Sequence, residues 1–229
     1  MKKNLTTLVL CSLAMVATSF AAEPPSRVAC IGDSITEGAG ADPGKSYPSQ
    51  LQELLGTGWK VGNYGVSGRT LLDKGDFPYT KENAYQDALQ FLPNVVIIML
   101  GTNDTKPQNW RYDHEFVADY TKLVAAFRAL ESKPQIYLCR PCPVVGDGSF
   151  DITEKNLQKV IQKVDALAKD LKTGVIDMYA ALEGKPELIP DKVHPNTQGA
   201  LEMSKAAAAV LTAQPPPSVS PAAHPADPR

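Results

Sequence analysis

The sequence predicts an α/β fold built on a five-stranded parallel sheet. Two observations indicate this fold. Short strand-like segments alternate with longer segments of helical periodicity, and one of the short segments, residues 95–100, is apolar throughout. A strand covered by helices on both faces has such a continuous apolar run. The length of 229 residues suits one globular domain with short extensions.

The elements can be assigned in chain order. Five short segments are predicted as strands: residues 27–32, 59–64, 95–100, 135–139 and 174–178. Shorter helices are expected over residues 47–55 and 83–91. Residues 112–130 and 152–171 carry apolar side chains at three- and four-residue spacing, which predicts helices with one buried face. Residues 197–211 are rich in alanine, which favours a closing helix.

The two ends of the chain are expected to lie outside the domain, which spans residues 23–212. Residues 1–22 resemble a cleaved signal peptide, with Lys2 and Lys3 before an apolar stretch and small residues near its end. A membrane anchor is the competing interpretation, but the apolar stretch is short and interrupted by polar residues. We therefore expect a secreted or periplasmic protein without stable membrane insertion. Residues 213–229 are rich in proline and alanine, which predicts an extended tail.

Charge and cysteine content exclude several function classes. The formal net charge of −2 offers no basic surface for nucleic acid and no polybasic patch for anionic lipid. After removal of the signal segment three cysteines remain, Cys30, Cys139 and Cys142. The last two have the spacing of a redox or metal pair but no second pair for zinc. We interpret them as small core residues, with a local disulfide as the alternative after export.

A serine follows the first predicted strand directly, in Gly-Asp-Ser34. The carboxyl edge of a parallel sheet is where such folds bind ligands. A serine hydroxyl becomes a good nucleophile only when a base takes its proton. Three histidines are available as bases. His224 lies in the tail and His114 opens a predicted helix, which leaves His194 as the candidate.

Asp191 precedes His194 by three residues within one short loop. Its carboxylate can therefore reach the imidazole Nδ1 proton and leave Nε2 facing the serine. Asn196 is placed to cap the final helix. A polar loop that simply leads into a helix, without any catalytic function, would show the same Asp-x-x-His pattern. The pattern alone is therefore a weak signal.

Two further polar segments follow the second and third predicted strands and so lie at the same edge of the sheet as Ser34. One contains Gly68, and the other is Gly-Thr-Asn103-Asp104. A glycine amide and an asparagine side chain can donate hydrogen bonds to the oxyanion of a tetrahedral intermediate. Each could also be a simple turn residue. All four segments together are better explained by a catalytic site.

These four segments resemble the four conserved blocks of the SGNH (GDSL-type) hydrolase family. The blocks are Gly32-Asp33-Ser34, Gly68, Gly101-Thr102-Asn103-Asp104 and Asp191-Lys192-Val193-His194, in the family's order across residues 27–212. The resemblance implies a flavodoxin-like α/β/α sandwich. It also implies a triad of Ser34, His194 and Asp191, and an oxyanion hole formed by the amides of Ser34 and Gly68 with the Asn103 side chain.

Other catalytic or binding sites are disfavoured. Residues 39–46 satisfy a relaxed phosphate-loop pattern, but a true phosphate loop starts at a strand end and feeds a helix. Here the Ser34 segment intervenes, and Pro48 limits where a helix can begin. The Gly-x-Ser-x-Gly elbow of other α/β hydrolases is absent at every serine. No His or Cys cluster has metal-ligand spacing, so neither a metal nor a cofactor is expected.

Loops at the predicted site mix aromatic and basic residues: Phe77, Tyr79, Trp110, Phe150, Arg69, Lys74, Lys106 and Arg111. Aromatics among polar groups suit the faces of sugars, and they also serve simply to anchor loops. The stretch from Gly101 to Trp110 is similar to exported family members that remove acetyl groups from carbohydrates. The resemblance therefore implies a small acyl group, acetyl, on a glycan. A lysophospholipase, thioesterase or arylesterase is the alternative, and an inactive glycan-binding module is the alternative from another class.

Overall fold

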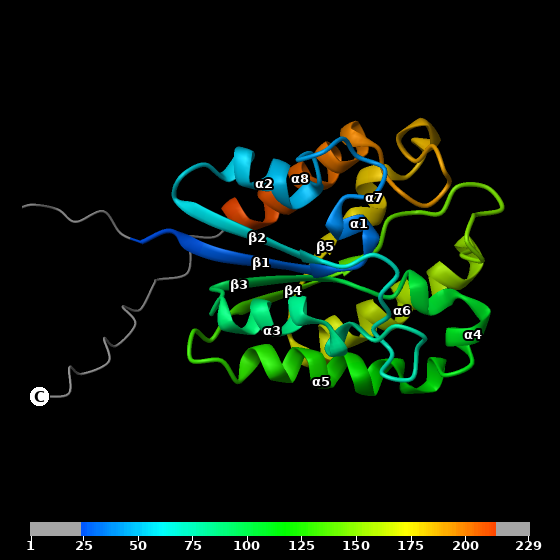
Figure 1. Cartoon of the computed structure of the whole chain (residues 1–229), viewed down its shortest axis with the longest axis horizontal. Coiled ribbons are helices and arrows are strands. Elements are labelled where there is room, and N and C mark those ends of the chain that lie inside the picture. The colour runs from blue at the N-terminus through cyan, green and yellow to red at the C-terminus, as the bar shows by residue number, and fades with distance from the viewer. Residues whose placement is uncertain (1–23, 214–229) are drawn as a thin grey trace, which may run out of the picture.

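Five parallel strands form the centre of the structure, a computed structural model that describes residues 24–213 (Figure 1). The strands are β1 (Ser26–Gly32), β2 (Trp59–Gly65), β3 (Val95–Met99), β4 (Gln135–Arg140) and β5 (Gly174–Asp177). They are arranged in the order β2-β1-β3-β4-β5, and each neighbouring pair is parallel. The predicted fold class, a five-stranded parallel α/β sheet, is confirmed.

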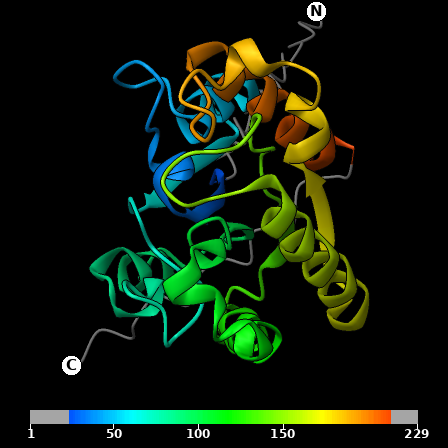
Figure 2. The same cartoon turned by 90° about the vertical axis from the view of Figure 1, so that its right-hand side faces the viewer.

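Helices cover both faces of this sheet. They are α1 (Ser34–Glu37), α2 (Tyr47–Leu55), α3 (Asn83–Gln90), α4 (Pro107–Trp110), α5 (Phe116–Arg128), α6 (Glu154–Leu171), α7 (Met178–Leu182) and α8 (Thr197–Thr212). Helices α2, α7 and α8 pack on one face, and α3, α5 and α6 pack on the other (Figures 1 and 2). The result is the three-layer α/β/α arrangement that the family resemblance implied.

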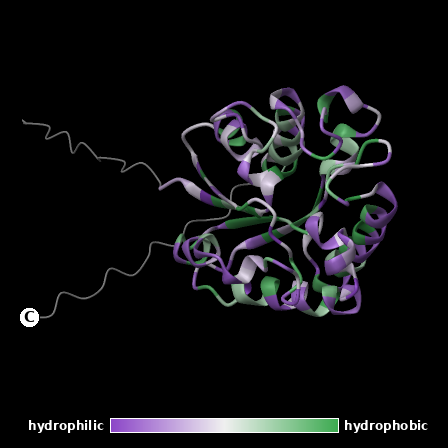
Figure 3. Ribbon diagram, turned by 45° about the vertical axis from the view of Figure 1, so that its right-hand side comes forward, coloured by the Kyte–Doolittle hydropathy of each residue, from purple (hydrophilic) through white to green (hydrophobic). Residues whose placement is uncertain are grey.

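The alternation of side chains along β3 explains why there are two separate cores. Val95 and Ile97 belong to the cluster under α2 and α8, whereas Val96 and Ile98 belong to the cluster under α3 and α5. All four are at most 1% exposed. Successive side chains of a strand point to opposite faces, so a strand between two helical layers must be apolar at every position. Figure 3 shows hydrophobic colour on the central strands and hydrophilic colour on outer loops.

Two predicted helices begin later than the sequence pattern indicated. The segment 112–130 opens with a 3₁₀ turn at Asp113–Glu115 before α5. The segment 152–171 enters α6 only at Glu154, because Ile152 instead forms a bridge to Ser149 across a tight turn. A local turn interaction has therefore replaced the first helical residues in each case.

The strand order places a topological switch point at β1. Strand β2 pairs with one edge of β1, and the chain then passes to the other edge of β1 to form β3. Parallel strands end at one edge of the sheet, and ligands bind where neighbouring connections diverge. Figure 2 looks onto this edge. The loops that follow β1, β2 and β3 therefore meet there.

The three cysteines of the described residues are free and buried. Cys30 lies in β1, and Cys142 follows β4 with its Sγ 3.5 Å from the Sδ of Met203. Burial raises the pKa of Cys30 to about 12, although a hydrogen bond with Tyr47 acts in the opposite direction. The interpretation as core residues is confirmed, and the alternative of a local disulfide between Cys139 and Cys142 is wrong for this structure.

The predicted signal segment, residues 1–22, lies outside the described residues, as does nearly all of the predicted tail. Within residues 24–213, no helix combines the length and the hydropathy that crossing a bilayer requires.

A buried carboxylate, Asp104, joins the loop after β3 to the loop after β2. Its two oxygens accept hydrogen bonds from the backbone amides of Leu71, at 3.0 Å, and Leu72, at 2.8 Å. Asp104 has no exposed surface. Burial raises its pKa from 3.8 to about 7, and the nearby charge of Asp33 acts in the same direction, whereas the two amides lower it.

We predict that Asp104→Asn alters how stability depends on pH. A carboxyl whose pKa is raised on folding stabilises the folded chain below about pH 4, and this contribution is lost as the pH rises through 7. We therefore compare the free energies of unfolding of the variant and of the unaltered chain at each pH. The difference, variant minus unaltered chain, should rise by about 4 kcal/mol between pH 4 and pH 8. Urea unfolding at several pH values measures this difference.

The matched control is Asp170→Asn, which removes one charge from an exposed position on α6. An asparagine at 104 has only one oxygen and leaves one amide unpaired, which costs the same at every pH. A stability difference for Asp104→Asn that does not change with pH would contradict the raised pKa.

Candidate active site

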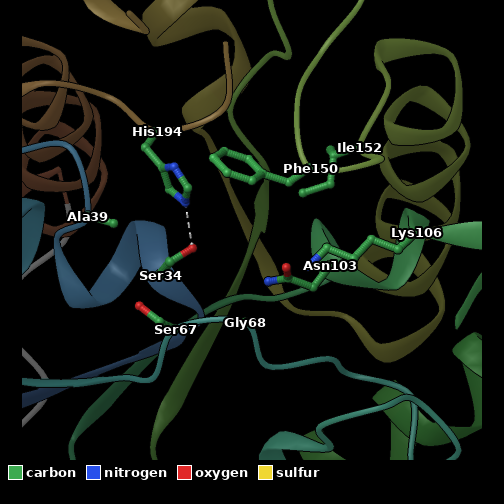
Figure 4. Close-up of a pocket in the computed structure, with 9 residues that line it drawn as sticks. All are labelled: Ser34, Ala39, Ser67, Gly68, Asn103, Lys106, Phe150, Ile152 and His194. Carbon is green, nitrogen blue, oxygen red and sulfur yellow. Dashed lines mark hydrogen bonds between the residues drawn. The ribbon is translucent and has the colours of Figure 1, made fainter. Parts of the chain in front are cut away.

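Ser34 lies at the first turn of α1, directly after β1. Asp33 precedes it as the helix N-cap, and its Oδ1 accepts a hydrogen bond from the Ile35 amide at 3.0 Å. This cap fixes the sharp change from strand to helix. The Ser34 side chain is nearly buried and lines a pocket at the carboxyl edge of the sheet (Figure 4).

His194 and Asp191 complete a chain of hydrogen bonds with Ser34. The Ser34 Oγ lies 2.9 Å from His194 Nε2, and His194 Nδ1 lies 2.7 Å from Asp191 Oδ2. An Nδ1–H that donates to the carboxylate leaves Nε2 as an acceptor for the serine proton. The structure therefore brings the three predicted residues together, although Ser34 and His194 are 160 positions apart in the sequence.

The loop that carries His194 is held by Asp191 itself. Its Oδ1 accepts hydrogen bonds from the backbone amides of Val193, at 3.0 Å, and His194, at 2.6 Å. Partial burial acts to raise the pKa of Asp191, but these bonds and the His194 side chain outweigh it and hold the pKa below its usual value. Asp191 is therefore a carboxylate at neutral pH and can accept a hydrogen bond from the imidazole Nδ1.

Asp33 is a second carboxyl group at the site. It is 1% exposed, and burial raises its pKa to about 6, while the Ile35 amide and the charge of His194 lower it. Its Oδ2 accepts a long hydrogen bond from Asn103 Nδ2 at 3.4 Å. Asp33 thus connects the Ser34 turn with the segment that follows β3.

Asn103 and Gly68 lie in the same pocket as Ser34. Asn103 begins a 3₁₀ turn after β3, and its Nδ2 donates to the Arg69 carbonyl at 3.2 Å. Gly68 has a φ of 80°, a left-handed conformation that favours glycine. The predicted oxyanion residues therefore come together from the ends of β1, β2 and β3.

Residues 39–46, which resemble a phosphate loop, instead support the His194 loop. Gly40 has a φ of 87°, and a Cβ there would lie only 2.7 Å from the Pro195 carbonyl. The Asp42 amide donates to Thr197 Oγ1 at 2.8 Å. The Lys45 ammonium pairs with Glu53 at 3.0 Å rather than facing a ligand.

The predicted cap of the final helix is confirmed. Asn196 precedes α8, and its Oδ1 accepts a hydrogen bond from the Gly199 amide at 2.9 Å. The cap fixes the start of α8 immediately after His194 and so helps to orient the loop.

The pocket has a volume of about 220 Å³. Its lining residues are Ser34, Ala39, Ser67, Gly68, Asn103, Lys106, Phe150, Ile152 and His194 (Figure 4). Among the aromatic and basic residues expected at the site, Phe150 and Lys106 do line it. Tyr79 is fully buried and Trp110 packs against the core, so both anchor loops, and Phe77 lies outside the pocket.

Sequence reasoning missed a contact between the first and second polar segments. The Ser67 amide donates to Glu37 Oε2 at 2.7 Å, and the Ser67 hydroxyl donates to the same oxygen. Both residues are exposed, and no periodicity marks either one. Ala39 and Ile152 were also missed as lining residues, since small or apolar side chains carry no chemical signal.

The remaining histidine of the described residues takes no part in the site. His114 lies in the 3₁₀ turn before α5 with 69% of its side chain exposed, 3.5 Å from Glu115. His224 lies outside the described residues. Among residues 24–213, no group of three or more His, Cys, Asp or Glu side chains is placed to hold a metal ion.

Three comparisons with known proteins bear on this site. The model of the GDSL-like lipase/acylhydrolase family matches residues 30–201. An acetylxylan esterase from Xylanibacter ruminicola is 41% identical over 210 residues, which cover 82% of this chain and 44% of that protein. The chain therefore spans less than half the length of this relative.

Solved structures show the same fold. A carbohydrate acetylesterase family member from Sinorhizobium meliloti matches with a TM-score of 0.67 and 22% identity, over 82% of this chain and 98% of that one. The aryl esterase of M. smegmatis matches with a TM-score of 0.67 and 22% identity, over 82% and 99%. The family model matches most of the chain, including all the residues of the pocket, and the chain therefore belongs to the GDSL-like lipase/acylhydrolase family.

Proposed function

We propose that this chain is a serine esterase in which Ser34 attacks the ester, His194 is the general base and Asp191 orients His194. The observation that carries the proposal is the continuous chain of hydrogen bonds, 2.9 Å from Ser34 to His194 and 2.7 Å from His194 to Asp191. A serine hydroxyl needs such a base because it is otherwise a weak nucleophile at neutral pH.

The oxyanion hole is formed by the amides of Ser34 and Gly68 with the Asn103 side chain. All three residues line the pocket around Ser34 Oγ. The Arg69 carbonyl accepts a hydrogen bond of 3.2 Å from Asn103 Nδ2, which holds the side-chain amide in position before substrate arrives. The second N–H of this amide makes only a long contact of 3.4 Å with Asp33, and it exchanges that contact for the oxyanion, whose negative charge it stabilises.

The reaction proceeds in two displacements. His194 takes the proton of Ser34 as the serine oxygen bonds to the ester carbonyl carbon, and the carbonyl oxygen becomes the oxyanion. The intermediate collapses, the ester bond to the alcohol breaks, and the alcohol leaves with the proton from His194. Water then attacks the acyl-enzyme with His194 again as base, and the acid and free Ser34 are released.

The substrate is a small acyl ester, acetyl, on a carbohydrate. The pocket volume of about 220 Å³ favours a short acyl group. The acetylxylan esterase relative, at 41% identity, favours an acetylated glycan. We further propose that residues 1–22 direct export and are removed, so that the enzyme acts outside the cytoplasm, where polysaccharides are found.

We expect Ser34→Ala to lower turnover of p-nitrophenyl acetate by a factor on the order of 10⁴ or more, the scale of triad deletions in other serine hydrolases. The variant should also fail to take up an organophosphonate probe, because the probe bonds to an activated serine oxygen. Ser67→Ala removes a neighbouring hydroxyl in the same pocket and should still be labelled at Ser34. An unlabelled native protein would favour an inactive glycan-binding module instead.

Asn103→Ala should lower kcat by about 10²–10³-fold with a much smaller change in KM, because the oxyanion exists only in the transition state and intermediate. Asn103→Asp, which keeps the shape but loses the donor, should show a similar loss. Asn83→Ala, an exposed asparagine at the start of α3, is the control. A loss below about threefold for both Asn103 variants would remove this residue from the oxyanion hole.

A panel of esters tests the acyl group and the alcohol. With p-nitrophenyl acetate, butyrate and octanoate, kcat/KM should fall with chain length because the pocket is small. Acetate should also be released from acetylated xylan in a reaction that Ser34→Ala abolishes. Preference for octanoate would instead indicate a lysophospholipase or thioesterase, and activity confined to aryl esters would indicate an arylesterase.

A further inference from the structure

Phe150 is a large apolar side chain that remains exposed at the mouth of the pocket. It is 57% exposed and lines the pocket beside Ile152 (Figure 4). A scattered apolar residue on a surface needs no explanation, but an aromatic ring at a pocket mouth faces whatever enters.

The backbone at Phe150 adopts an unfavourable conformation. Phe150 and Asp151 have φ angles of 55° and 61°, and the Ile152 amide donates to the Ser149 carbonyl at 2.9 Å across them. Two central residues of positive φ correspond to a type I′ turn, which strongly favours asparagine and glycine. Phenylalanine is unfavourable in such a turn. Its presence therefore indicates that the aromatic ring, rather than the turn conformation, is the reason for phenylalanine at position 150.

The turn is held firmly by its neighbours. Ile152 is 3% exposed and packs in a small apolar cluster with Val144, Leu157 and Val193. Val193 adjoins His194, so the same cluster supports the turn and the His194 loop. On the other side of the turn, the Lys192 ammonium pairs with Asp147. The backbone of the turn that carries Phe150 is therefore anchored beside the His194 loop.

The position of Phe150 beside His194 identifies which half of the ester it faces. The two rings have centroids 5.5 Å apart and an interplanar angle of 59°. In the proposed reaction His194 passes its proton to the leaving oxygen, so the alcohol must lie against the imidazole. A ring that lies beside His194 and lines the same pocket is placed to contact that alcohol.

We propose that Phe150 is the specificity residue for the alcohol half of the substrate and that it stacks against the face of a sugar ring. This inference rests on the proposed esterase function. A pyranose carries CH groups on its face, which suit an aromatic surface, and hydroxyl groups at its edge. Lys106, which lines the same pocket, is a hydrogen-bond donor for those hydroxyls.

The test compares kcat/KM on two acetates, a monoacetylated methyl β-xylopyranoside and ethyl acetate, which has no ring. Phe150→Asn removes the ring and suits a positive φ, so the variant should fold at least as stably as the unaltered chain. Its kcat/KM should fall about tenfold more on the xyloside than on ethyl acetate, mainly through KM, because the stacked apolar area is lost. Phe150→Tyr keeps the ring and should restore the selectivity.

Phe77→Asn is the matched control, because Phe77 is 56% exposed and lies outside the pocket. It should leave the ratio of the two kcat/KM values unchanged. If Phe150 only supports His194, Phe150→Asn will reduce both activities equally and shift the pH profile, which would overturn the inference. A greater loss on phenyl acetate than on the xyloside would overturn the assignment to sugars.

The outcomes also separate this inference from the proposed function. Ser34-dependent turnover of the xyloside with no change of selectivity in the Phe150 variants overturns the inference alone. If the unaltered chain hydrolyses ethyl acetate but not the xyloside, the proposal of a glycan substrate is wrong, and the inference about Phe150 is wrong with it. No Ser34-dependent turnover of either ester overturns the esterase proposal.

Discussion

The parallel pairing of β1 with both β2 and β3 is the constraint on which the site depends. Parallel strands end at the same edge, and β2 and β3, the next two strands along the chain, lie on opposite sides of β1. Gly32 at the end of β1 is in register with Gly65 of β2 and Met99 of β3. The loops that follow these three strands therefore start side by side at one edge of the sheet. The fourth segment, with His194, reaches the same edge because α8 packs on α2.

The loops at this edge are joined by two carboxyl groups whose charged form is disfavoured by burial. Asp33 and Asp104 are almost fully buried, and both have pKa values raised by burial. Each nevertheless accepts backbone hydrogen bonds that define a loop, so removing either would leave buried amides unpaired. Strain at Phe150 is a third local cost at the same edge. Such costs concentrate where a site needs fixed geometry, and the apolar layers on both faces of the sheet offset them.

The sheet and the members of the proposed site could be predicted because their signals are local. A continuous apolar run predicts β3, and the polar residues that follow three strands must meet if the strands are parallel. The supporting contacts could not be predicted, because they depend on tertiary geometry. The pair of Ser67 with Glu37 and the position of Phe150 beside His194 both join segments that are distant in the sequence. The late start of α6 has a different, local origin, since a turn bond between Ile152 and Ser149 competes with helix propensity.

The three buried thiols connect folding to the redox state of the surroundings. Only a thiolate attacks a disulfide, and burial raises the pKa of Cys30, Cys139 and Cys142, so none reacts while the sheet is closed. Once the chain opens, all three become ordinary cysteines, and in an oxidising medium an unfolded molecule can be trapped by a non-native disulfide. The lifetime of this protein under such conditions is then governed by how rarely it unfolds rather than by its equilibrium stability.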